Sequence, residues 1–204
     1  MMPKFRLLFF PAMGKAEPIR LLFAYTQTEY EDVRIPFEQW PQMQPLTPMG
    51  QLPVLEVDGV QLAPVPVIGA YLGSLFGLSG KNTLEAAQCQ MFATMLDDLT
   101  LKLIPFFLTE VDDREKKLAH MTNEHVKPFL YRIESQLANS TSGYLVGDSV
   151  TWVDFMIFHC GVTCLIEKLH LNANDYPHLG RFAEKFKQLP GINEWIEKRP
   201  KTDW

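Results

Sequence analysis

The sequence predicts an α/β domain followed by an all-α domain, the first over residues 1–78 and the second over residues 83–204. Short apolar runs typical of strands occur before residue 63, and an Asp58-Gly59 pair between two of them is a strong hairpin signal. Beyond the early eighties the apolar residues recur at helical spacing in long segments. The first domain therefore combines strands with helices, and the second is built from helices alone.

The first domain opens with a strand, a helix and a second strand. Residues 5–10 form an apolar run that ends at Pro11 and is short enough for a buried strand. Residues 17–25 carry a proline near a helix start and apolar residues at helical spacing. Residues 30–34 are predicted to form the second strand, which completes a βαβ unit.

A hairpin and a helix complete this domain. Residues 54–57 alternate and are rich in β-branched side chains, and residues 60–62 resume the strand after the turn. Pro53 precedes the hairpin and leaves one backbone edge open, because proline has no N–H to donate. A closing helix is expected over residues 67–76, so the order of elements is βαβ followed by ββα.

The all-α domain follows a linker over residues 77–82. Its middle helix, predicted over residues 152–169, is apolar nearly all round and should form the core. Thr151 and Asp154 have the spacing of a capping box at the start of this helix. The other predicted helices span residues 83–110, 114–138, 178–188 and 192–198.

Length, charge and composition exclude several classes of function. A chain of 204 residues with 47% hydrophobic residues can bury a substantial core. The formal net charge is −5 and there is no basic cluster, which argues against nucleic acid as a partner. No apolar run approaches the roughly 18 residues of a membrane span, and no signal peptide is recognisable. We therefore expect a cytoplasmic protein without a membrane partner.

The cysteines are too few for a disulfide framework. Cys160 and Cys164 lie one helical turn apart with His159 beside them, which is a conceivable metal site. Packing of thiols in a helical core explains the same spacing without a ligand and is the preferred interpretation. No metal site and no bound cofactor are therefore predicted.

Several motifs, spread over both halves of the chain, match one family. They include Ala16-Glu17-Pro18-Ile19-Arg20, Pro48-Met49-Gly50-Gln51-Leu52-Pro53-Val54-Leu55, Leu96-Asp97-Asp98, Val150-Thr151-Trp152-Val153-Asp154-Phe155 and Trp195-Ile196-Glu197-Lys198-Arg199-Pro200. With these motifs the chain resembles a cytosolic glutathione transferase of the sigma class, as found in insects and other invertebrates. The resemblance implies a thioredoxin-like N-terminal domain with a cis Pro53, and an all-helical C-terminal domain.

The catalytic position of this family is altered. In the family, a tyrosine at the end of the first strand donates a hydrogen bond to the glutathione sulfur and stabilises the thiolate. The resemblance places that position at Phe9, since the Phe-Pro that follows the tyrosine in insect members matches Phe10-Pro11. Residues 5–20 contain no Ser, Thr, Cys or Tyr that could replace the lost hydroxyl. A charge-assisted hydrogen bond is worth roughly 1.5–3 kcal/mol, so weak or absent enzyme activity is expected.

The residues that hold glutathione in the family are altered as well. Pro64-Val65 replaces a Gln-Ser pair that, by resemblance, grips the γ-glutamyl carboxylate at the start of the third helix. Met13 occupies the position of a basic residue, and Gln44 that of a lysine. At roughly 0.5–1.5 kcal/mol per neutral hydrogen bond, these losses predict that glutathione is at most a weak ligand.

Part of the glutathione site is retained. By resemblance, Gln51 offers its side chain, Leu52 offers its backbone beside Pro53, and Trp40 offers its indole N–H. The fold itself also requires Gln51 and Pro53, and Trp40 has an alternative role in covering the edge of the domain.

Four charged residues are further candidates. Asp97 and Asp98 match the pair that reaches the neighbouring subunit's ligand in sigma-class dimers, although an acidic pair on a helix is usually a solvated face. Lys15 and Arg20 are candidates for electrostatic compensation of the lost ligands, and the surface of a helix explains them equally well.

A hydrophobic pocket is expected where the family binds its second substrate. Its candidate residues are Phe10, Met13, Phe106, Phe107 and Trp204. Core packing is the alternative explanation for Phe106 and Phe107. Because Phe, Met, Pro and Val replace polar ligands of glutathione, the two pockets are expected to join into one cavity that favours a small apolar guest.

Three functions therefore stay open. The first is a family member with impaired or lost glutathione conjugation that binds apolar ligands or serves a structural role. The second is an active transferase for conjugation, peroxide reduction or prostaglandin isomerisation, with an unidentified group that activates the thiol. The third is a non-catalytic partner in a dimer. By resemblance the protein is expected to be a homodimer.

Overall fold

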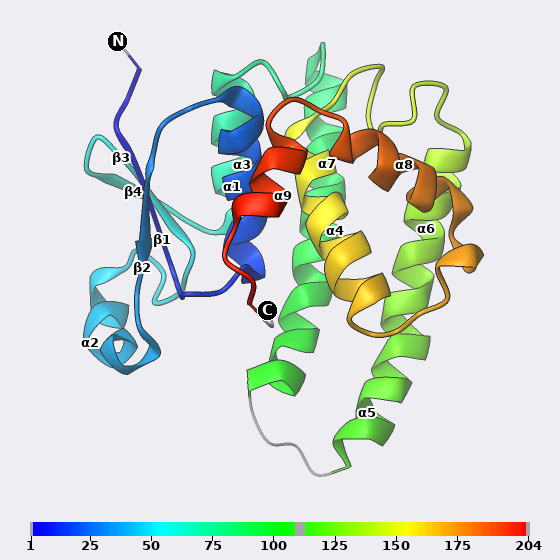
Figure 1. Ribbon diagram of the computed structural model, residues 1–204, viewed down its shortest axis with the longest axis horizontal. Coiled ribbons are helices and arrows are strands. Elements are labelled where there is room, and N and C mark those ends of the chain that lie inside the picture. Colours follow the sequence, from blue (N-terminus) through cyan, green and yellow to red (C-terminus); the bar gives the residue numbers. More distant parts are fainter. Residues whose placement is uncertain (1, 109–112, 203–204) are drawn as a thin grey trace. The chain divides into compact units, whose positions relative to one another are not determined.

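The computed structural model describes residues 2–108 and 113–202, with only the backbone described at residues 107 and 108. The chain forms two compact units, residues 1–78 together with 185–204, and residues 79–184 (Figure 1). The predicted fold class is confirmed, because the first unit holds a small sheet flanked by helices and the second is helical. Residues 185–204 group with the first unit and residues 79–82 with the second, and the domain ranges 1–78 and 83–204 stay a prediction.

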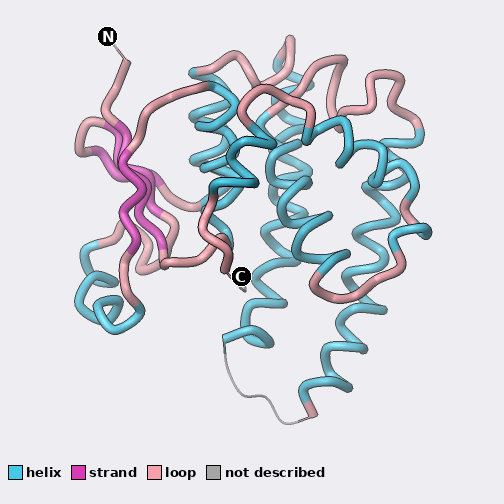
Figure 2. The backbone as a smooth tube through the Cα atoms, viewed as in Figure 1, coloured by secondary structure: helices cyan, strands magenta, loops and turns pink. Residues whose placement is uncertain are grey.

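A four-stranded sheet forms the centre of the first unit (Figure 2). Its strands are β1 (Phe5–Phe9), β2 (Glu31–Arg34), β3 (Val54–Val57) and β4 (Val60–Leu62), in the spatial order β2-β1-β3-β4. β1 runs parallel to β2 and antiparallel to β3, and β3 and β4 form the predicted hairpin. Parallel pairing aligns Phe9 with Arg34, so the carboxyl ends of β1 and β2 lie at one edge of the sheet.

One face of this sheet is covered by α1 (Glu17–Thr26) and α3 (Val65–Leu75) (Figure 1). The alternating side chains of β1 explain this packing, since the Phe5 ring lies 5.3 Å from the Phe23 ring of α1 and Leu7 is fully buried. Helix α3 starts two residues before the predicted start at residue 67. Pro66 lies in its first turn, where a proline costs no hydrogen bond.

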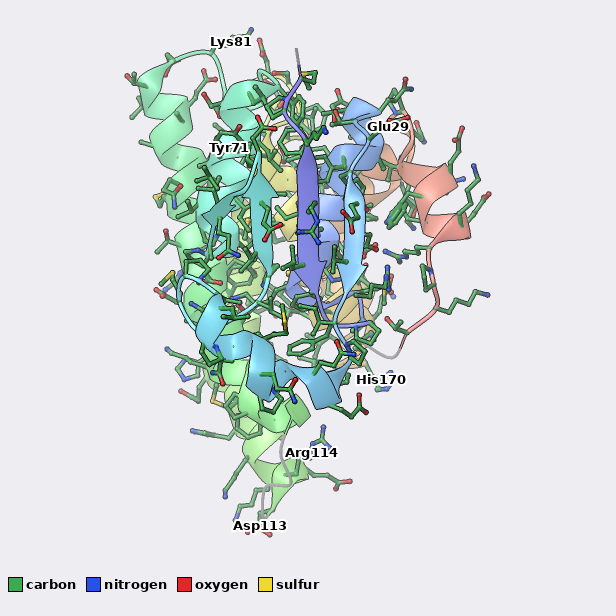
Figure 3. All side chains as sticks on the ribbon, turned by 90° about the vertical axis from the view of Figure 1, so that its left-hand side faces the viewer. Glu29, Tyr71, Lys81, Asp113, Arg114 and His170 are labelled. Carbon is green, nitrogen blue, oxygen red and sulfur yellow. The ribbon has the colours of Figure 1, made fainter. Side chains whose placement is uncertain are left out.

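On the opposite face of the sheet, the side chains are apolar at one end of the strands and charged at the other (Figure 3). Leu8 lies between Val33 and Val54 in one cross-strand row, and Met43 packs against this row. One row further along, Arg6 forms ion pairs with Glu31 and Glu56, and this end is exposed. Only the apolar end therefore needs a cover.

That cover was not predicted from the sequence. It consists of the short helix α2 (Trp40–Met43) between two single turns of 3₁₀-helix, Phe37–Gln39 and Gln44–Leu46. Prolines at 41 and 45 limit each of these elements to about one turn. The segment places Trp40 beside the end of β1.

Helix α9 (Ile192–Lys198) belongs to the first unit and packs on α1. Gly191 precedes α9 with φ of +74°, and a Cβ atom there would lie 2.4 Å from the carbonyl oxygen of Ala24. Glycine is therefore required at this close approach. In addition, the Glu17 carboxylate of α1 accepts hydrogen bonds from the Trp195 indole and from Arg199.

The second unit contains α4 (Thr83–Leu108), α5 (Arg114–Met121), α6 (Lys127–Ala138), α7 (Trp152–Met156) and most of α8 (Pro177–Lys187). The predicted end of the first of these helices, at residue 110, lies outside the described residues. Two π-helical segments were not expected: residues Thr122–Val126 join α5 to α6, and Ile157–Glu167 continue α7. The predicted helices over 114–138 and 152–169 are thus each a composite of α and π turns.

The core of the second unit surrounds α7, as predicted. Trp152, Val153 and Phe155 are buried, and Asp154 is fully buried among them. Its carboxylate accepts hydrogen bonds from the backbone N–H groups of Thr151 and Leu145, at 2.7 and 3.0 Å. The predicted hydrogen bond between Asp154 and the helix start is confirmed by the contact with Thr151. The contact with Leu145 also holds the loop before the helix.

Candidate functional site

The end of strand β1 carries Phe9, the residue at the predicted catalytic position. The residue is buried, with 7% exposed, and its ring lies against the turn that precedes α1. Gly14 in that turn has φ of +41°, and a Cβ atom there would lie 2.7 Å from Phe9 Cε1 and 2.8 Å from Cζ. The turn therefore accommodates the ring only because residue 14 is glycine. The Phe9 side chain has no polar atom with which to contact a ligand.

An aromatic cluster continues from Phe9 toward the surface. The Phe10 ring stacks on the Phe37 ring at 4.6 Å and 14°, and it meets the Trp40 ring edge-on at 5.6 Å. Phe9 packs edge-on against the inner side of Phe10 at 5.5 Å. Phe37 is 55% exposed, so the outer end of the cluster is open to solvent. The sequence did not point to Phe37, because its contact with Phe10 depends on the unpredicted turn at residues 37–39.

Arg20 lies behind Phe9 and is completely buried. Its guanidinium carbon is 5.9 Å from the centre of the Phe9 ring, and its Nη1 atom donates to the carbonyl oxygen of Ala12 at 2.7 Å. It also forms ion pairs with Glu17 at 3.2 Å and with Asp32 at 3.1 Å. The helix-surface explanation of Arg20 is therefore wrong, because the side chain is buried, whereas its electrostatic compensation for the lost ligands stays a prediction.

Tyr30 carries a hydroxyl inside the same domain, and it does not replace the missing donor. Its ring stacks on Phe23 at 4.4 Å, and its hydroxyl is buried. Burial, and next the charge of Asp32, raise the pKa of Tyr30 well above its ordinary value. The group therefore stays protonated and inside the domain.

Met13 and Lys15 occupy the turn between Phe9 and α1. Met13 is buried, with 8% exposed, and its backbone N–H donates to the Thr202 hydroxyl at 3.1 Å. Lys15 is half-buried at the centre of the 3₁₀ turn Gly14–Ala16. The thioether of Met13 supplies no charge where the family, by resemblance, has a basic residue.

The N-terminus of α3 is poor in donors for an anion. Pro64 and Pro66 have no N–H, and the N–H groups of Val67 and Ile68 both donate to the Pro64 carbonyl, at 3.0 and 3.1 Å. Within residues 64–68, the N–H of Val65 is the single donor left at this helix start. The Val65 side chain is buried, with 2% exposed. A carboxylate at this position would therefore lose most of the backbone donors that helix starts ordinarily provide.

The loop before β3 holds the remaining predicted ligands. Gln44 donates from its side chain to the Gly50 carbonyl at 3.0 Å, so its amide closes the loop. Gln51 and Leu52 are half-buried, and the Leu52–Pro53 bond is cis, as the resemblance implied. A second cis bond, Ala63–Pro64, was not predicted.

The other predicted residues belong to the second unit or lie outside the described residues. Asp97 is half-buried and Asp98 exposed on α4, and Phe106 is half-buried near the end of that helix. The side chain of Phe107 and the whole of Trp204 lie outside the described residues. The structure therefore brings together Phe9, Phe10, Met13 and Trp40 from the predicted set, each from the first unit.

Neither a metal centre nor a membrane span emerges from the described part of the chain. No group of three or more His, Cys, Asp and Glu side chains suited to a metal ion occurs there. None of its helices combines the length and apolar character that crossing a membrane requires. Cys160 is buried as predicted, whereas Cys164 is partly exposed and contacts His159.

Family models match both halves of the chain. A glutathione S-transferase N-terminal domain matches residues 5–74, and a glutathione S-transferase C-terminal domain matches residues 97–199. The chain belongs to the glutathione S-transferase family. The predicted family is thereby confirmed.

Individual relatives cover the chain from end to end. The chain is 37% identical to glutathione S-transferase 1 of Ascaris suum, with 100% of both chains covered. It is 36% identical to the hematopoietic prostaglandin D synthase of Gallus gallus, over 98% of this chain and 99% of the relative. A crystal structure of the glutathione S-transferase from Ascaris lumbricoides superposes with a TM-score of 0.87 at 37% identity, covering 99% of this chain and 100% of the other.

Proposed function

We propose that this glutathione S-transferase has weak or no glutathione conjugation activity, and that its altered site binds a small apolar molecule. The observation that carries the proposal is the buried Phe9 ring at the end of β1, packed over Gly14. A side chain without a hydroxyl cannot donate to a sulfur, and a free thiol with its ordinary pKa near 8.5 is only a few per cent thiolate at neutral pH. The loss of such a donor corresponds to roughly 10- to 150-fold in rate.

The start of α3 supports the same proposal independently. Two prolines and two internal hydrogen bonds leave little for a carboxylate to bind, and Gln44 is engaged with Gly50. Weak binding and weak activation would act together, because a thiol must be both held and ionised to react. Glutathione is accordingly proposed to be a weak ligand.

The aromatic cluster supports an apolar guest. Phe10, Phe37 and Trp40 pack ring against ring just beyond the end of β1, and the Phe37 ring is 55% exposed. A flat apolar molecule could extend the stack on the exposed side of Phe37, and burial of apolar area would stabilise it by about 25 cal/mol per Å².

Turnover and ligand binding test the two parts of the proposal. With chlorodinitrobenzene and saturating glutathione, we expect a rate at least tenfold below that of a relative with the tyrosine. A fluorescent apolar probe such as anilinonaphthalene sulfonate should bind, and Phe37→Ala should weaken it severalfold. Val60→Ala is the matched control, because Val60 is 64% exposed at the hairpin, away from the aromatic cluster. Turnover like that of the relative would contradict the proposed loss of conjugation activity. Equal effects of Phe37→Ala and Val60→Ala on probe binding would contradict the proposed binding of an apolar molecule at the aromatic cluster.

An active transferase or prostaglandin isomerase is the second candidate. It is favoured by the 36–37% identity to a transferase and to a prostaglandin D synthase over nearly the whole chain. This function requires a donor other than residue 9, and the turnover assay distinguishes it from the first candidate. The third candidate, a non-catalytic partner in a dimer, predicts that activity appears only when another subunit is added.

Assembly and location complete the proposal. We propose a cytoplasmic homodimer of the sigma class, on the strength of the motifs that the chain shares with that class. Light scattering at micromolar concentration should give twice the mass of 23.4 kDa. A monomer would contradict the proposed assembly and would leave the proposal for Phe9 untouched.

A further inference from the structure

The π-helical segment after α7 places a thiol against an imidazole. In the segment Ile157–Glu167, His159 and Cys164 are five residues apart, and Cys164 Sγ lies 3.5 Å from His159 Nε2. Side chains meet three and four residues apart on an α-helix, whereas the i→i+5 bonding of a π-helix brings residues five apart toward one line. The pair therefore depends on the π conformation.

The two partners differ in access to solvent. His159 is buried, with 1% exposed, whereas Cys164 is partly exposed. A buried imidazole keeps a fixed orientation, while a partly exposed sulfur can be reached by a reagent. Cys160, one turn earlier, is 8% exposed, and Cys89 on α4 is fully buried. The three thiols of the chain therefore differ in both access and surroundings.

We propose that Cys164, with His159 as its proton acceptor, is a reactive thiol of this protein and a site of mixed-disulfide formation with small disulfides. His159 Nε2 takes the proton of the Cys164 thiol, and the resulting thiolate attacks one sulfur of the small disulfide. The S–S bond of that disulfide breaks, and a new S–S bond joins Cys164 to one half of it. The other half leaves as a thiolate and takes up a proton. The disulfide is the oxidant, so the exchange is balanced without a further reagent.

The location of Cys164 makes the imidazole essential. The helical segment ends at Glu167, and the C-terminal end of a helix disfavours an anion. A thiolate there needs a neighbouring cation, which His159 becomes when it accepts the proton. Cys89 provides the opposite case, because burial raises its pKa to about 11 and keeps it in the thiol form. This site is in the second unit and does not depend on the function proposed for the first.

Intact-mass measurement on the native protein tests the proposal. The protein is incubated at pH 7 with either 2-hydroxyethyl disulfide or glutathione disulfide, and the adduct is located by peptide mapping. We expect one adduct, on Cys164, formed at least about fivefold faster than on N-acetylcysteine under the same conditions. Neither Cys89 nor Cys160 should react before Cys164 is consumed.

Two substitutions assign the role of the imidazole. His159→Gln should slow the adduct at least about tenfold, while His170→Gln, an exposed histidine beyond the segment, should leave the rate unchanged. Circular dichroism checks that both variants fold. If His159→Gln does not fold, the comparison of wild-type Cys164 with N-acetylcysteine decides. An adduct mainly on Cys89 or Cys160, a rate at or below that of N-acetylcysteine, or an unchanged rate in folded His159→Gln would overturn the proposal.

Discussion

The Phe9 ring covers Gly14 so closely that a Cβ atom at Gly14 would lie 2.8 Å from the Cζ atom of Phe9. Cζ is the atom that would carry the hydroxyl of a tyrosine. The side chain at residue 9 and the backbone at residue 14 are therefore one packing unit, and changes at either position act on the other. Behind them, the buried Arg20 fixes the same turn through the carbonyl groups of Ala12 and Met13.

Replacing Gly14 with alanine should destabilise the protein by about 2–4 kcal/mol, because the new Cβ atom meets the Phe9 ring and the backbone is left-handed. Gly59→Ala is the matched control. Gly59 also has a positive φ, +86°, but nothing lies within 4 Å of its Cβ position, so about 1 kcal/mol is expected. Urea unfolding measures both changes. Equal losses of stability would mean that the Phe9 ring moves freely away from residue 14.

Restoring the hydroxyl alone should restore little activity. Phe9→Tyr supplies a donor for the sulfur, but Met13, Pro64 and Val65 still fail to hold glutathione. We expect a higher rate only at glutathione concentrations near saturation. Adding Pro64→Gln and Val65→Ser should lower KM for glutathione, and the combined gain should exceed the product of the separate gains, since holding and ionising act on one thiol.

Phe10→Tyr is the control for that experiment, because it adds a hydroxyl to the neighbouring ring of the aromatic cluster. It should not raise the rate. If Phe9→Tyr by itself gave full activity at sub-millimolar glutathione, the start of α3 would still bind the glutathione carboxylate. Our interpretation of Pro64 and Val65 would then be wrong.

The attachment of α9 to α1 should depend on the buried Glu17 carboxylate. Glu17 Oε1 accepts from Trp195 Nε1 at 2.7 Å and from Arg199 Nη1 at 3.0 Å. Trp195→Phe removes the first donor and keeps an aromatic ring, so we expect a loss of about 1–3 kcal/mol in the free energy of unfolding. Asn193→Ala, which removes an exposed contact to Glu197 on the same helix, should cost less than about 0.5 kcal/mol. A similar cost for both variants would argue against this attachment.

Alkaline pH should destabilise the protein through Cys89. Burial raises the pKa of its thiol from 9.0 to about 11, so the unfolded chain loses the proton first as the pH rises. The free energy of unfolding should be insensitive to this group below about pH 8.5 and should fall by up to about 2–3 kcal/mol between pH 9 and 11. Cys89→Ala lacks this thiol and should show a smaller fall in denaturant titrations across that range. An equal fall in both proteins would assign the effect to other groups, such as the buried Tyr176.

Elements with a local cause were predicted well from the sequence. The hairpin of residues 54–62 and helix α9 have the predicted bounds, because a turn pair and a glycine boundary specify them within a few residues. The family resemblance likewise gave the cis bond at Pro53.

Features with a non-local cause were missed. Arg20 is buried because its partners Glu17, Asp32 and the carbonyl groups of residues 12–13 come together only in the fold. The stacking of Phe37 on Phe10 depends on a single 3₁₀ turn, which leaves no periodic pattern in the sequence. The contact of His159 with Cys164 depends on π-helical bonding, whereas the apolar periodicity of the sequence indicates α-helical spacing.

Titration calorimetry with glutathione tests the central proposal most directly, because it measures binding without requiring turnover. The wild-type protein should show millimolar or undetectable affinity, and the Pro64→Gln, Val65→Ser variant should bind at least about tenfold more tightly, which corresponds to one recovered charge-assisted hydrogen bond. Micromolar binding by the wild-type protein would contradict the account and would favour a working glutathione transferase whose sulfur is activated by a group other than residue 9.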